Sequence, residues 1–361
     1  MFRLEELGWT PFFAQQFPRN TQGELRPARI AEENRAIYKV FTEQGEACAE
    51  LAGRLRHEAN SRADLPAVGD WVLVSRRANS DTRTGDRATI HRVLPRTSKF
   101  SRKIAGTKTE EQIVAANIDT LFIVASLQHE FNPRRLERYL SLAWESGASP
   151  IVVLNKSDLC EEPALQQVQS GIALLGVRVL TTSALRGDGI AQLREFAATG
   201  TSALLGSSGV GKSSLVNALL GEARQETRDV RTADGKGRHT TTTRQMLLLP
   251  GGGLLIDTPG MRKLQLWDAS AGLAHAFADI QTLAQECRFR DCRHESEPGC
   301  AVRAAQEDGA LQAERLASFH KLGREEQFIE AKQDAAVRAQ QTKAVKRLMK
   351  QQNRFYRDRG R

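Results

Sequence analysis

Hydrophobic and polar residues alternate in short runs between Arg26 and Arg102, and turn residues separate the runs. An alternation with a period of two places apolar side chains on one face of a β-strand and polar side chains on the other. The strands predicted in this way are Ala28 to Ile30, Ala36 to Phe41, Cys48 to Leu55, Trp71 to Val74 and Thr89 to Leu94. They predict a small β-barrel, and the oligonucleotide-binding (OB) fold fits best. The alternative is a barrel that only packs against its neighbour.

Further along the chain, continuous apolar runs alternate with segments of helical spacing. Asp119 to Ser126 and Pro150 to Leu154 have the composition of buried strands, and Pro133 opens a helix between them. Strands that alternate with helices predict a parallel sheet in an α/β domain. Helical spacing returns in Leu273 to Leu283 and Leu311 to Ile329, so the C-terminal part is predicted to be mostly helical.

The composition is that of a soluble globular protein of two or three domains, with 361 residues of which 40% are hydrophobic. Glu5 and Glu6 interrupt the apolar residues of Met1 to Phe17 and no cleavage site follows, so we expect no signal peptide. No stretch approaches the roughly 18 apolar residues of a membrane span. We therefore expect a cytoplasmic protein with no membrane partner.

Gly206 to Ser213 has the sequence Gly-Ser-Ser-Gly-Val-Gly-Lys-Ser, the spacing of a phosphate-binding loop. Its glycines let backbone N–H groups face the phosphates, Lys212 reaches the outer phosphates, and the Ser213 hydroxyl is left for Mg²⁺. A β-type run precedes the loop and a helical run follows it, as this motif requires. The predicted phosphate-binding residues are Gly206, Ser207, Ser208, Gly209, Val210, Gly211, Lys212, Ser213 and Ser214.

Two short motifs before this loop predict a guanine site. Asn155-Lys156-Ser157-Asp158 ends one apolar strand, and Ser183-Ala184-Leu185 ends another. The Asp158 carboxylate can accept from the ring N–H and the exocyclic amine of guanine, whereas adenine would leave an oxygen unpaired. Asn155 would brace the loop, the Lys156 stem would lie against the base, and the Ala184 N–H would meet the guanine carbonyl. The predicted guanine-binding residues are Asn155, Lys156, Asp158, Ser183 and Ala184.

The segment after the phosphate loop predicts the switches of a GTPase. Arg224 to Arg238 is polar and contains two glycines, as a mobile switch loop does. Among the threonines that follow, we assign Thr241 to the Mg²⁺ shell, although the spacing does not separate it from its neighbours. After a predicted hairpin, Asp257 would hold Mg²⁺ through water and the Gly260 N–H would approach the γ-phosphate.

These motifs occur in a rotated order, because the guanine-binding motifs precede the phosphate loop. The usual GTPase order is phosphate loop, switch, Asp-x-x-Gly and then the guanine-binding motifs. Chain termini lie at the surface and often close together, so a circular permutation preserves the sheet. The sequence therefore predicts a circularly permuted GTPase domain, with the next domain attached directly after the second switch.

Three of the five cysteines cluster near the C-terminus together with a histidine. Three thiolates and one imidazole form a closed tetrahedral zinc set, and the polar loop between them has too few apolar residues to fold by itself. A catalytic zinc would keep an open position, and a redox cysteine would not need four ligand-type residues. We predict one structural Zn²⁺ bound by Cys287, Cys292, His294 and Cys300.

The net charge of +9 is concentrated in Lys332 to Arg361, where ten Lys and Arg stand against two Asp. Such a one-signed tail repels itself unless polyanionic phosphate neutralises it, so nucleic acid is the favoured partner. The alternative is a solvated helical face. Phe355 and Tyr356 lie among the arginines and would stack on unpaired bases.

Taken together, the ordered motifs, the Cys/His spacing and the preceding barrel resemble the RsgA (YjeQ-type) family of circularly permuted, ribosome-associated GTPases. The resemblance covers most of the chain and implies a GTPase that binds the small ribosomal subunit and its rRNA late in assembly. It also implies stimulation by the subunit and the release or checking of other assembly factors. Gly209 stands where some related GTPases have a potassium-binding asparagine, which leaves potassium dependence open.

The sequence and the resemblance together divide the chain into five parts, and we expect a monomer. The parts are an N-terminal extension (1–25), an OB-type barrel (26–112), the permuted GTPase domain (113–268), a helical zinc-binding domain (269–331) and a basic tail (332–361).

The expected mechanism is slow hydrolysis of Mg·GTP to GDP and phosphate, accelerated when a partner orders the switch. Met261 follows Gly260 where Ras-like proteins have the glutamine that orients the attacking water, and an apolar side chain cannot do this. His239 is our candidate for that role, and its alternative is a loop histidine that contacts RNA or solvent. Two other functions stay open: a GTP-gated RNA-binding clamp, and a GTPase that acts on transfer RNA or in translation.

Overall fold

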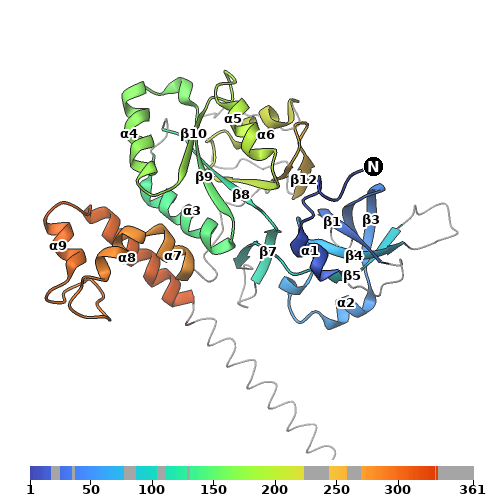
Figure 1. The fold of residues 1–361 in the computed structure, drawn as a ribbon, viewed down its shortest axis with the longest axis horizontal. Coiled ribbons are helices and arrows are strands. Elements are labelled where there is room, and N and C mark those ends of the chain that lie inside the picture. The colour runs from blue at the N-terminus through green and yellow to red at the C-terminus, as the bar shows by residue number, and fades with distance from the viewer. Residues whose placement is uncertain are drawn as a thin grey trace, which may run out of the picture.

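The computed structural model describes residues 1–17, 25–34, 37–76, 87–103, 111–127, 131–222, 244–257, 270–329 and 331. Figure 1 shows a barrel in blue, an α/β domain in green and yellow, and C-terminal helices in orange and red. The predicted architecture, a barrel followed by an α/β domain and a helical domain, is confirmed. The predicted loop Asn79 to Asp86 and the basic tail from Lys332 lie outside the described residues.

The barrel is a closed sheet of five strands. Its strands are β1 (Leu25–Asn34), β2 (Ile37–Thr42), β3 (Gly45–Leu51), β4 (Trp71–Arg76) and β5 (Arg87–Val93). They pair in the order β1-β2-β3-β5-β4, and pairing of β4 with β1 closes the barrel. Alternate residues such as Ile30, Val40 and Ile90 fill its interior and are fully buried. Closure removes the exposed strand edges, which is how small barrels avoid edge-to-edge association.

The third predicted strand is shorter than its hydrophobic pattern suggested. It ends at Leu51, and the helix α2 (Gly53–Glu58) follows, with the short 3₁₀ helix η1 (Arg62–Asp64) after it. Leu55, assigned to the strand from its sequence, packs against the barrel core from the helix. A single apolar residue fits both the period of a strand and the period of a helix, so only its tertiary contacts show to which element it belongs.

The α/β domain is a sheet with helices on both faces. Its parallel strands are β8 (Thr120–Ala125), β9 (Ser149–Asn155), β10 (Arg178–Thr182), β11 (Thr201–Gly206) and β13 (Leu254–Asp257), and β12 (Gln245–Leu248) is antiparallel to β13. The order across the sheet is β10-β9-β8-β11-β13-β12. The helices are α3 (Pro133–Ser146), α4 (Glu162–Ala173), α5 (Ile190–Ala197) and α6 (Lys212–Leu220), with η2 (Ser157–Leu159) after β9.

Alternate residues along β8 point to opposite faces of this sheet. Leu121 and Ile123 belong to the core that contains α3 and α4, whereas Phe122 and Val124 belong to the core that contains α5 and α6. All four are buried. Burial on both faces explains the continuous apolar runs of the sequence, since a parallel sheet covered by helices has no solvent face.

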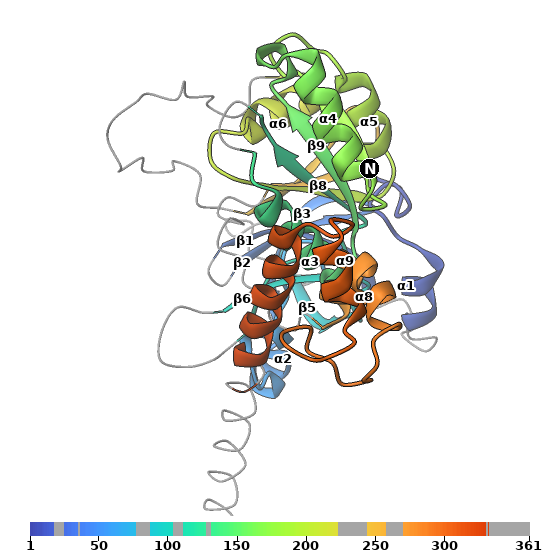
Figure 2. The ribbon, with the colours of Figure 1, turned by 90° about the vertical axis from the view of Figure 1, so that its left-hand side faces the viewer.

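The C-terminal part consists of α7 (Ser270–Ala276), α8 (Ala278–Ala284), α9 (Ala301–Glu307) and a helix over residues 313–329. The predicted helical spacing of Leu273 to Leu283 falls on two helices, α7 and α8, with Phe277 between them. The Phe277 ring is buried and packs edge-on against Phe319 with ring centroids 5.5 Å apart. Figure 2 shows these helices beside α3, and the Gly272 N–H donates to Glu145 Oε2 of α3 at 3.1 Å.

The N-terminal residues and the ribbon β6 (Lys99–Lys103) with β7 (Glu111–Ala116) join the barrel to the α/β domain. At this junction Arg29 is buried and donates to the carbonyls of Leu7, Gly69 (3.2 Å) and Asn117 (2.9 Å). Burial lowers the Arg29 pKa to about 10, so it stays charged at neutral pH. The short helix α1 (Pro11–Gln16) packs near this point, where Phe13 lies against Trp71.

Candidate nucleotide site and metal centre

The predicted phosphate loop joins β11 to α6. Gly209 and Gly211 adopt left-handed φ angles of +81° and +92°, which glycine reaches without strain. A side chain at Gly206 would come within 2.3 Å of the Val124 carbonyl oxygen, so the loop can approach β8 only with glycine there. The loop ends at the N-terminus of α6, where backbone N–H groups and the helix dipole favour a phosphate.

Lys212 folds back over the phosphate loop. Its Nζ donates to the Gly206 carbonyl at 2.9 Å and to the Ser207 carbonyl at 2.6 Å. Ser213 follows it in the first turn of α6. The ammonium group is therefore held at the mouth of the loop, where a phosphate chain would replace the carbonyls as its partner.

Asn155 connects three segments at the end of β9 and is buried. Its Nδ2 donates to the Val210 carbonyl at 2.8 Å, which ties it to the phosphate loop. Its Oδ1 accepts from the Ala184 N–H at 3.2 Å and from the Thr182 hydroxyl at 3.1 Å. The bracing role predicted for Asn155 corresponds to these contacts. The predicted contact of the Ala184 N–H with a guanine carbonyl stays a prediction.

Asp158 and Ser183 meet beside this brace. The Ser183 hydroxyl donates to Asp158 Oδ1 at 2.5 Å and orients the carboxylate. Lys156 has a left-handed φ of 64°, which turns the chain sharply between Asn155 and Asp158. The structure thus brings the two predicted guanine-binding motifs together, although 25 positions separate Asp158 and Ser183.

Sequence reasoning missed three features of this site. The Val210 carbonyl and the Thr182 hydroxyl hold Asn155, and no residue pattern marks such acceptors and donors. Leu185 is 87% exposed directly after Ala184, next to the predicted base site.

Of the remaining predicted motifs, only Asp257 is described, at the carboxyl end of a parallel strand. Asp257 ends β13, which pairs with β11, the strand that leads into the phosphate loop. Ligands of open α/β sheets bind at this edge, outside the carboxyl ends of the strands. Thr241, His239, Gly260 and Met261 lie outside the described residues, so their predicted roles stay predictions.

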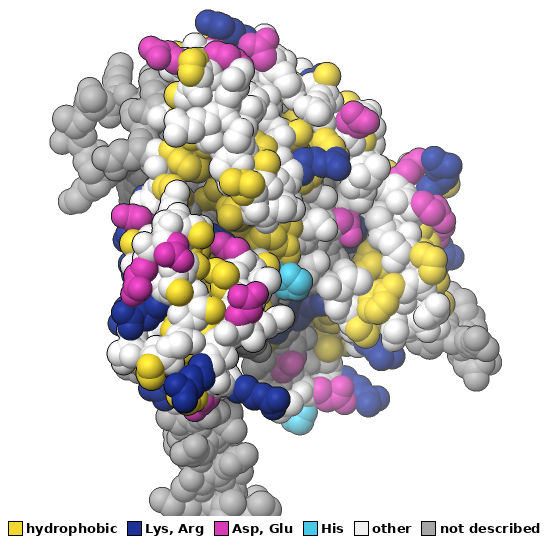
Figure 3. Space-filling view, turned by 60° about the vertical axis from the view of Figure 1, so that its left-hand side comes forward, with side chains coloured by type: hydrophobic (Ala, Val, Ile, Leu, Met, Phe, Trp, Pro, Cys, Tyr) yellow, Lys and Arg dark blue, Asp and Glu magenta, His cyan; other side chains and the backbone are white. Residues whose placement is uncertain are grey.

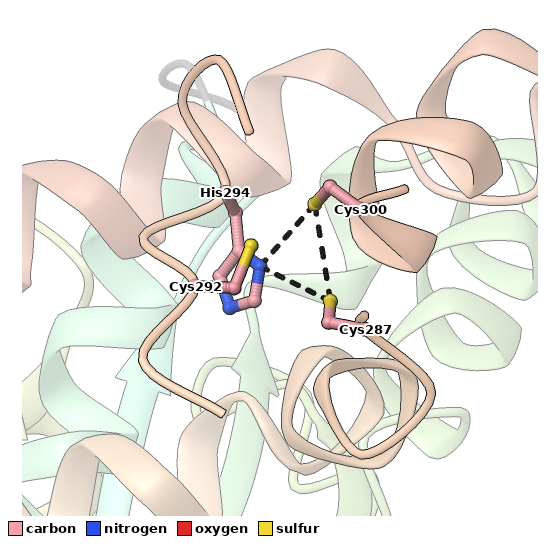
Figure 4. Close-up of side chains that lie close together, drawn as sticks. All are labelled: Cys287, Cys292, His294 and Cys300. Atoms are coloured by element: carbon pink, nitrogen blue, oxygen red, sulfur yellow. Dashed lines mark hydrogen bonds between the residues drawn. The ribbon is translucent and has the colours of Figure 1, made fainter. Parts of the chain in front are cut away.

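The four predicted metal ligands converge between α8 and α9 (Figure 4). His294 Nδ1 lies 3.7 Å from Cys287 Sγ and 3.4 Å from Cys300 Sγ, and the two sulfurs are 3.9 Å apart. All four ligand atoms, including Cys292 Sγ, lie within 4.8 Å of one another. A tetrahedron of ligands about 2.3 Å from a zinc ion has edges of about 3.8 Å, so the cluster has the size of a zinc site.

The backbone around the metal ligands supports this arrangement. His294 has a left-handed φ of 61°, which directs its ring inward. Burial lowers the His294 pKa, which favours the neutral imidazole that a metal requires. The Glu297 carboxylate accepts from the backbone N–H groups of Arg293 (2.9 Å), Glu295 (3.0 Å) and Ser296 (3.0 Å). These hydrogen bonds close the loop that carries His294.

Known proteins share this arrangement of parts. Residues 93–267 match the family model described as RsgA GTPase. A protein from Opitutus terrae named small ribosomal subunit biogenesis GTPase RsgA is 48% identical over 343 residues, covering 92% of each chain. The chain belongs to the RsgA GTPase family. It is a GTP hydrolase, as predicted.

Other RsgA relatives extend the match over nearly the whole chain. The Streptomyces coelicolor protein of the same name is 45% identical and covers 95% of this chain and 92% of its own length. Among solved structures, YjeQ from Thermotoga maritima has a TM-score of 0.61 at 28% identity and covers 84% of this chain and 98% of its own. YloQ, titled a circularly permuted GTPase, has the same TM-score at 23% identity and covers 86% and 98%, a likeness of fold. The permutation predicted from motif order is confirmed.

The surface of this RsgA-family protein is unevenly charged. On the face in Figure 3, Lys and Arg side chains gather along the lower edge of the C-terminal part, away from the α/β domain. The loop between α8 and α9, residues 285–300, carries the predicted metal ligands and is called the metal loop below. In it, Phe289 is 41% exposed and the Arg288 guanidinium lies 5.4 Å from its ring centroid. Within the described residues, no helix has the length and hydropathy needed to cross a membrane.

Proposed function

We propose that this GTPase acts in late assembly of the small ribosomal subunit, binds its rRNA and is stimulated by the subunit. The observation that carries the proposal is the Asn155 side chain, because it joins the guanine-reading motif to the phosphate loop. A GTP-dependent step requires a site that recognises the guanine base and binds the phosphates of the same nucleotide. The names of the curated relatives, small ribosomal subunit biogenesis GTPases, support the assembly role.

In this proposal the residues at the sheet edge divide the recognition of GTP. Asp158 reads the base while Ser183 orients its carboxylate, and the Lys156 stem lies against the ring. Gly206 to Ser214 surround the phosphates, and Lys212 exchanges its two carbonyl partners for phosphate oxygens. The observed Lys212 position supports this exchange, because both carbonyls belong to the loop that would hold the phosphates.

Two metal ions complete the proposal. A bound Mg²⁺ would neutralise charge on the phosphates. Ser213 and Thr241 would hold it, with Asp257 acting through water. Cys287, Cys292, His294 and Cys300 would hold one structural Zn²⁺, for which the sulfur-rich donor set and the tetrahedral spacing are the support.

Hydrolysis would be slow without the subunit. Met261 cannot orient the attacking water, so the catalytic arrangement needs an ordered switch supplied by a partner. Gly260 would approach the γ-phosphate, and His239 would position the water. The reaction itself needs positioning and charge stabilisation, which residues of this chain and the partner provide together.

The barrel and the metal loop are the proposed rRNA contacts. The exposed Phe289 ring, flanked by Arg288, offers a stacking surface next to positive charge, which suits unpaired RNA. We propose that the chain divides into five functional segments, 1–25, 26–112, 113–268, 269–331 and 332–361. We also propose that the protein is a monomer and that it acts in the cytoplasm, where small subunits mature.

GTP hydrolysis measured with and without purified small ribosomal subunits tests the proposal. We expect the rate to rise with small subunits and to stay low with large subunits. Lys212→Ala should remove the stimulated rate. A preference for ATP, or an unchanged rate with small subunits, would contradict the proposal.

A further inference from the structure

Helix α3 begins beside the phosphate loop, and its first turn reaches that loop. The Asn132 side chain caps the helix by accepting from the Arg135 backbone N–H at 3.1 Å. From this turn the Arg135 guanidinium donates through Nη1 to Ser207 Oγ at 2.9 Å, joining residues 72 positions apart. Arg135 is exposed, so core packing does not force this contact.

Ser207 is held a second time through its backbone. Its carbonyl accepts from Lys212 Nζ, as described above. When Lys212 turns to bound phosphates, this hydrogen bond breaks. The Arg135 bond uses the Ser207 side chain and not its carbonyl, so it can keep Ser207 in place while Lys212 changes partners.

The same helix carries the C-terminal part. Glu137 accepts from Arg315 Nη1 at 2.8 Å, and both side chains are largely buried, with 8% and 13% of their surface exposed. Arg138, one residue further, donates to Glu325 Oε2 at 2.6 Å. Within α3, Arg135 therefore contacts the phosphate loop, and Glu137 and Arg138 contact the C-terminal part, which contains the metal-binding cluster.

We propose that Arg135 is a positioning residue for the phosphate loop, acting through Ser207, and that α3 thereby couples this loop to the metal-binding part. The inference rests on the phosphate-binding role proposed above for residues 206–214. A short helix is a rigid element, so a displacement of the C-terminal helices that moves α3 also moves the Arg135 guanidinium. The phosphate loop then loses or gains the bond that orients Ser207.

A different role for Arg135 makes different predictions. An arginine that touches the γ-phosphate would affect GTP and not GDP, and it would act without Ser207. A residue that positions the loop affects both nucleotides alike, because the loop grips phosphates common to GTP and GDP. It also depends on Ser207, so the two substitutions are not additive.

Affinities for GDP and for a non-hydrolysable GTP analogue test the positioning role in the full chain. We expect Arg135→Ala to weaken both by the same factor, about three- to tenfold. Ser207→Ala should have the same effect, the double variant should be no weaker than either single one, and Arg135→Lys should restore part of the affinity. Arg134→Ala is the matched control, because Arg134 is exposed in the same turn and has no hydrogen bond or ion pair among the described residues.

Several outcomes would overturn the positioning role. They are an effect on the GTP analogue alone, additive effects of the two substitutions, or an Arg135→Ala protein that binds as the wild type does. Thermal unfolding of each variant shows whether a loss of affinity reflects a loss of fold. The Arg135→Ala protein should unfold at the wild-type temperature, since its side chain is exposed.

The coupling through α3 is tested by Glu325→Ala, which removes the partner of Arg138. We expect it to change GDP affinity in the wild-type background and to leave it unchanged in the Arg135→Ala background. Glu314→Ala is the control, because Glu314 is an exposed carboxylate near the start of the helix over residues 313–329, which also carries Glu325. Equal effects in both backgrounds, or no effect in either, would refute the coupling. Failure of wild-type protein to bind guanine nucleotides would instead refute the proposed function.

Discussion

Asn155 Nδ2 donates to the Val210 carbonyl at 2.8 Å, across 55 positions of the chain. In this permuted chain the proposed guanine-binding motif is synthesised first, and its asparagine is then anchored by a loop that comes later. The hydrogen bond joins the proposed base-binding motif directly to the proposed phosphate loop. The oxygen of the same amide accepts from the Ala184 N–H and the Thr182 hydroxyl, so three hydrogen bonds of this side chain lie within the site.

We expect Asn155→Ala to lower the stability of the protein by about 1–3 kcal/mol, because it leaves buried groups such as the Thr182 hydroxyl without a partner. GDP affinity should fall at least tenfold, since both recognition loops lose their common anchor. Urea unfolding and a nucleotide titration measure the two effects. A protein of normal stability that binds GDP normally would show that Asn155 does not brace the site.

Asp158→Asn should exchange the base preference of the site. The amide replaces an acceptor by a donor, so it no longer matches the exocyclic amine of guanine but matches the carbonyl that xanthine has there. We expect GDP affinity to fall by about tenfold or more and xanthosine diphosphate affinity to rise. Asp188→Asn is the control, an exposed carboxylate of the neighbouring turn. Unchanged GDP affinity in Asp158→Asn would exclude Asp158 as the base reader.

Removal of the metal should unfold the loop between α8 and α9. We expect one equivalent of zinc per chain by elemental analysis, and Cys292→Ala or Cys300→Ala should lose it, because a closed site needs all four ligands. Cys48→Ala and Cys160→Ala should keep it, since both cysteines lie outside the cluster. Full metal content in Cys300→Ala, or zinc lost equally in all four variants, would contradict this assignment.

Acid should weaken the metal loop through Glu297. Hydrogen bonds from the backbone N–H groups, that of Arg293 first, lower the Glu297 pKa to about 2 from its usual 4.5. Because the folded pKa is the lower one, the stabilisation is complete above about pH 4.5 and is lost as the pH falls toward 2. We expect Glu297→Gln to destabilise the loop at pH 7 and to make little difference near pH 2.

Amide hydrogen exchange of residues 288–299 at several pH values measures this effect. The wild-type loop should be protected at pH 6, and the protection should be weaker in Glu297→Gln. Glu295→Gln, an exposed carboxylate of the same loop, is the control. Equal protection of the wild type and Glu297→Gln across the pH range would refute the role of the carboxylate.

The sequence by itself determined the parts whose chemistry is local. The glycines of the phosphate loop, the Asn-Lys-x-Asp motif and the four metal ligands are recognisable because each function requires particular residue types at short spacing. Their order along the chain also determined the permutation. The alternating and continuous apolar runs predicted the barrel and the parallel sheet, since burial on one face or on two leaves different patterns.

Only the tertiary structure decided the features that depend on distant segments. Leu55 packs against the barrel core from a helix, and Phe277, whose ring is buried against Phe319, lies between α7 and α8. The contact of Arg135 with Ser207 and the bond from Asn155 to Val210 leave no pattern in the sequence, because an arginine or a backbone carbonyl is compatible with countless surroundings. Such contacts arise when the sheet and α3 place these groups within hydrogen-bonding distance.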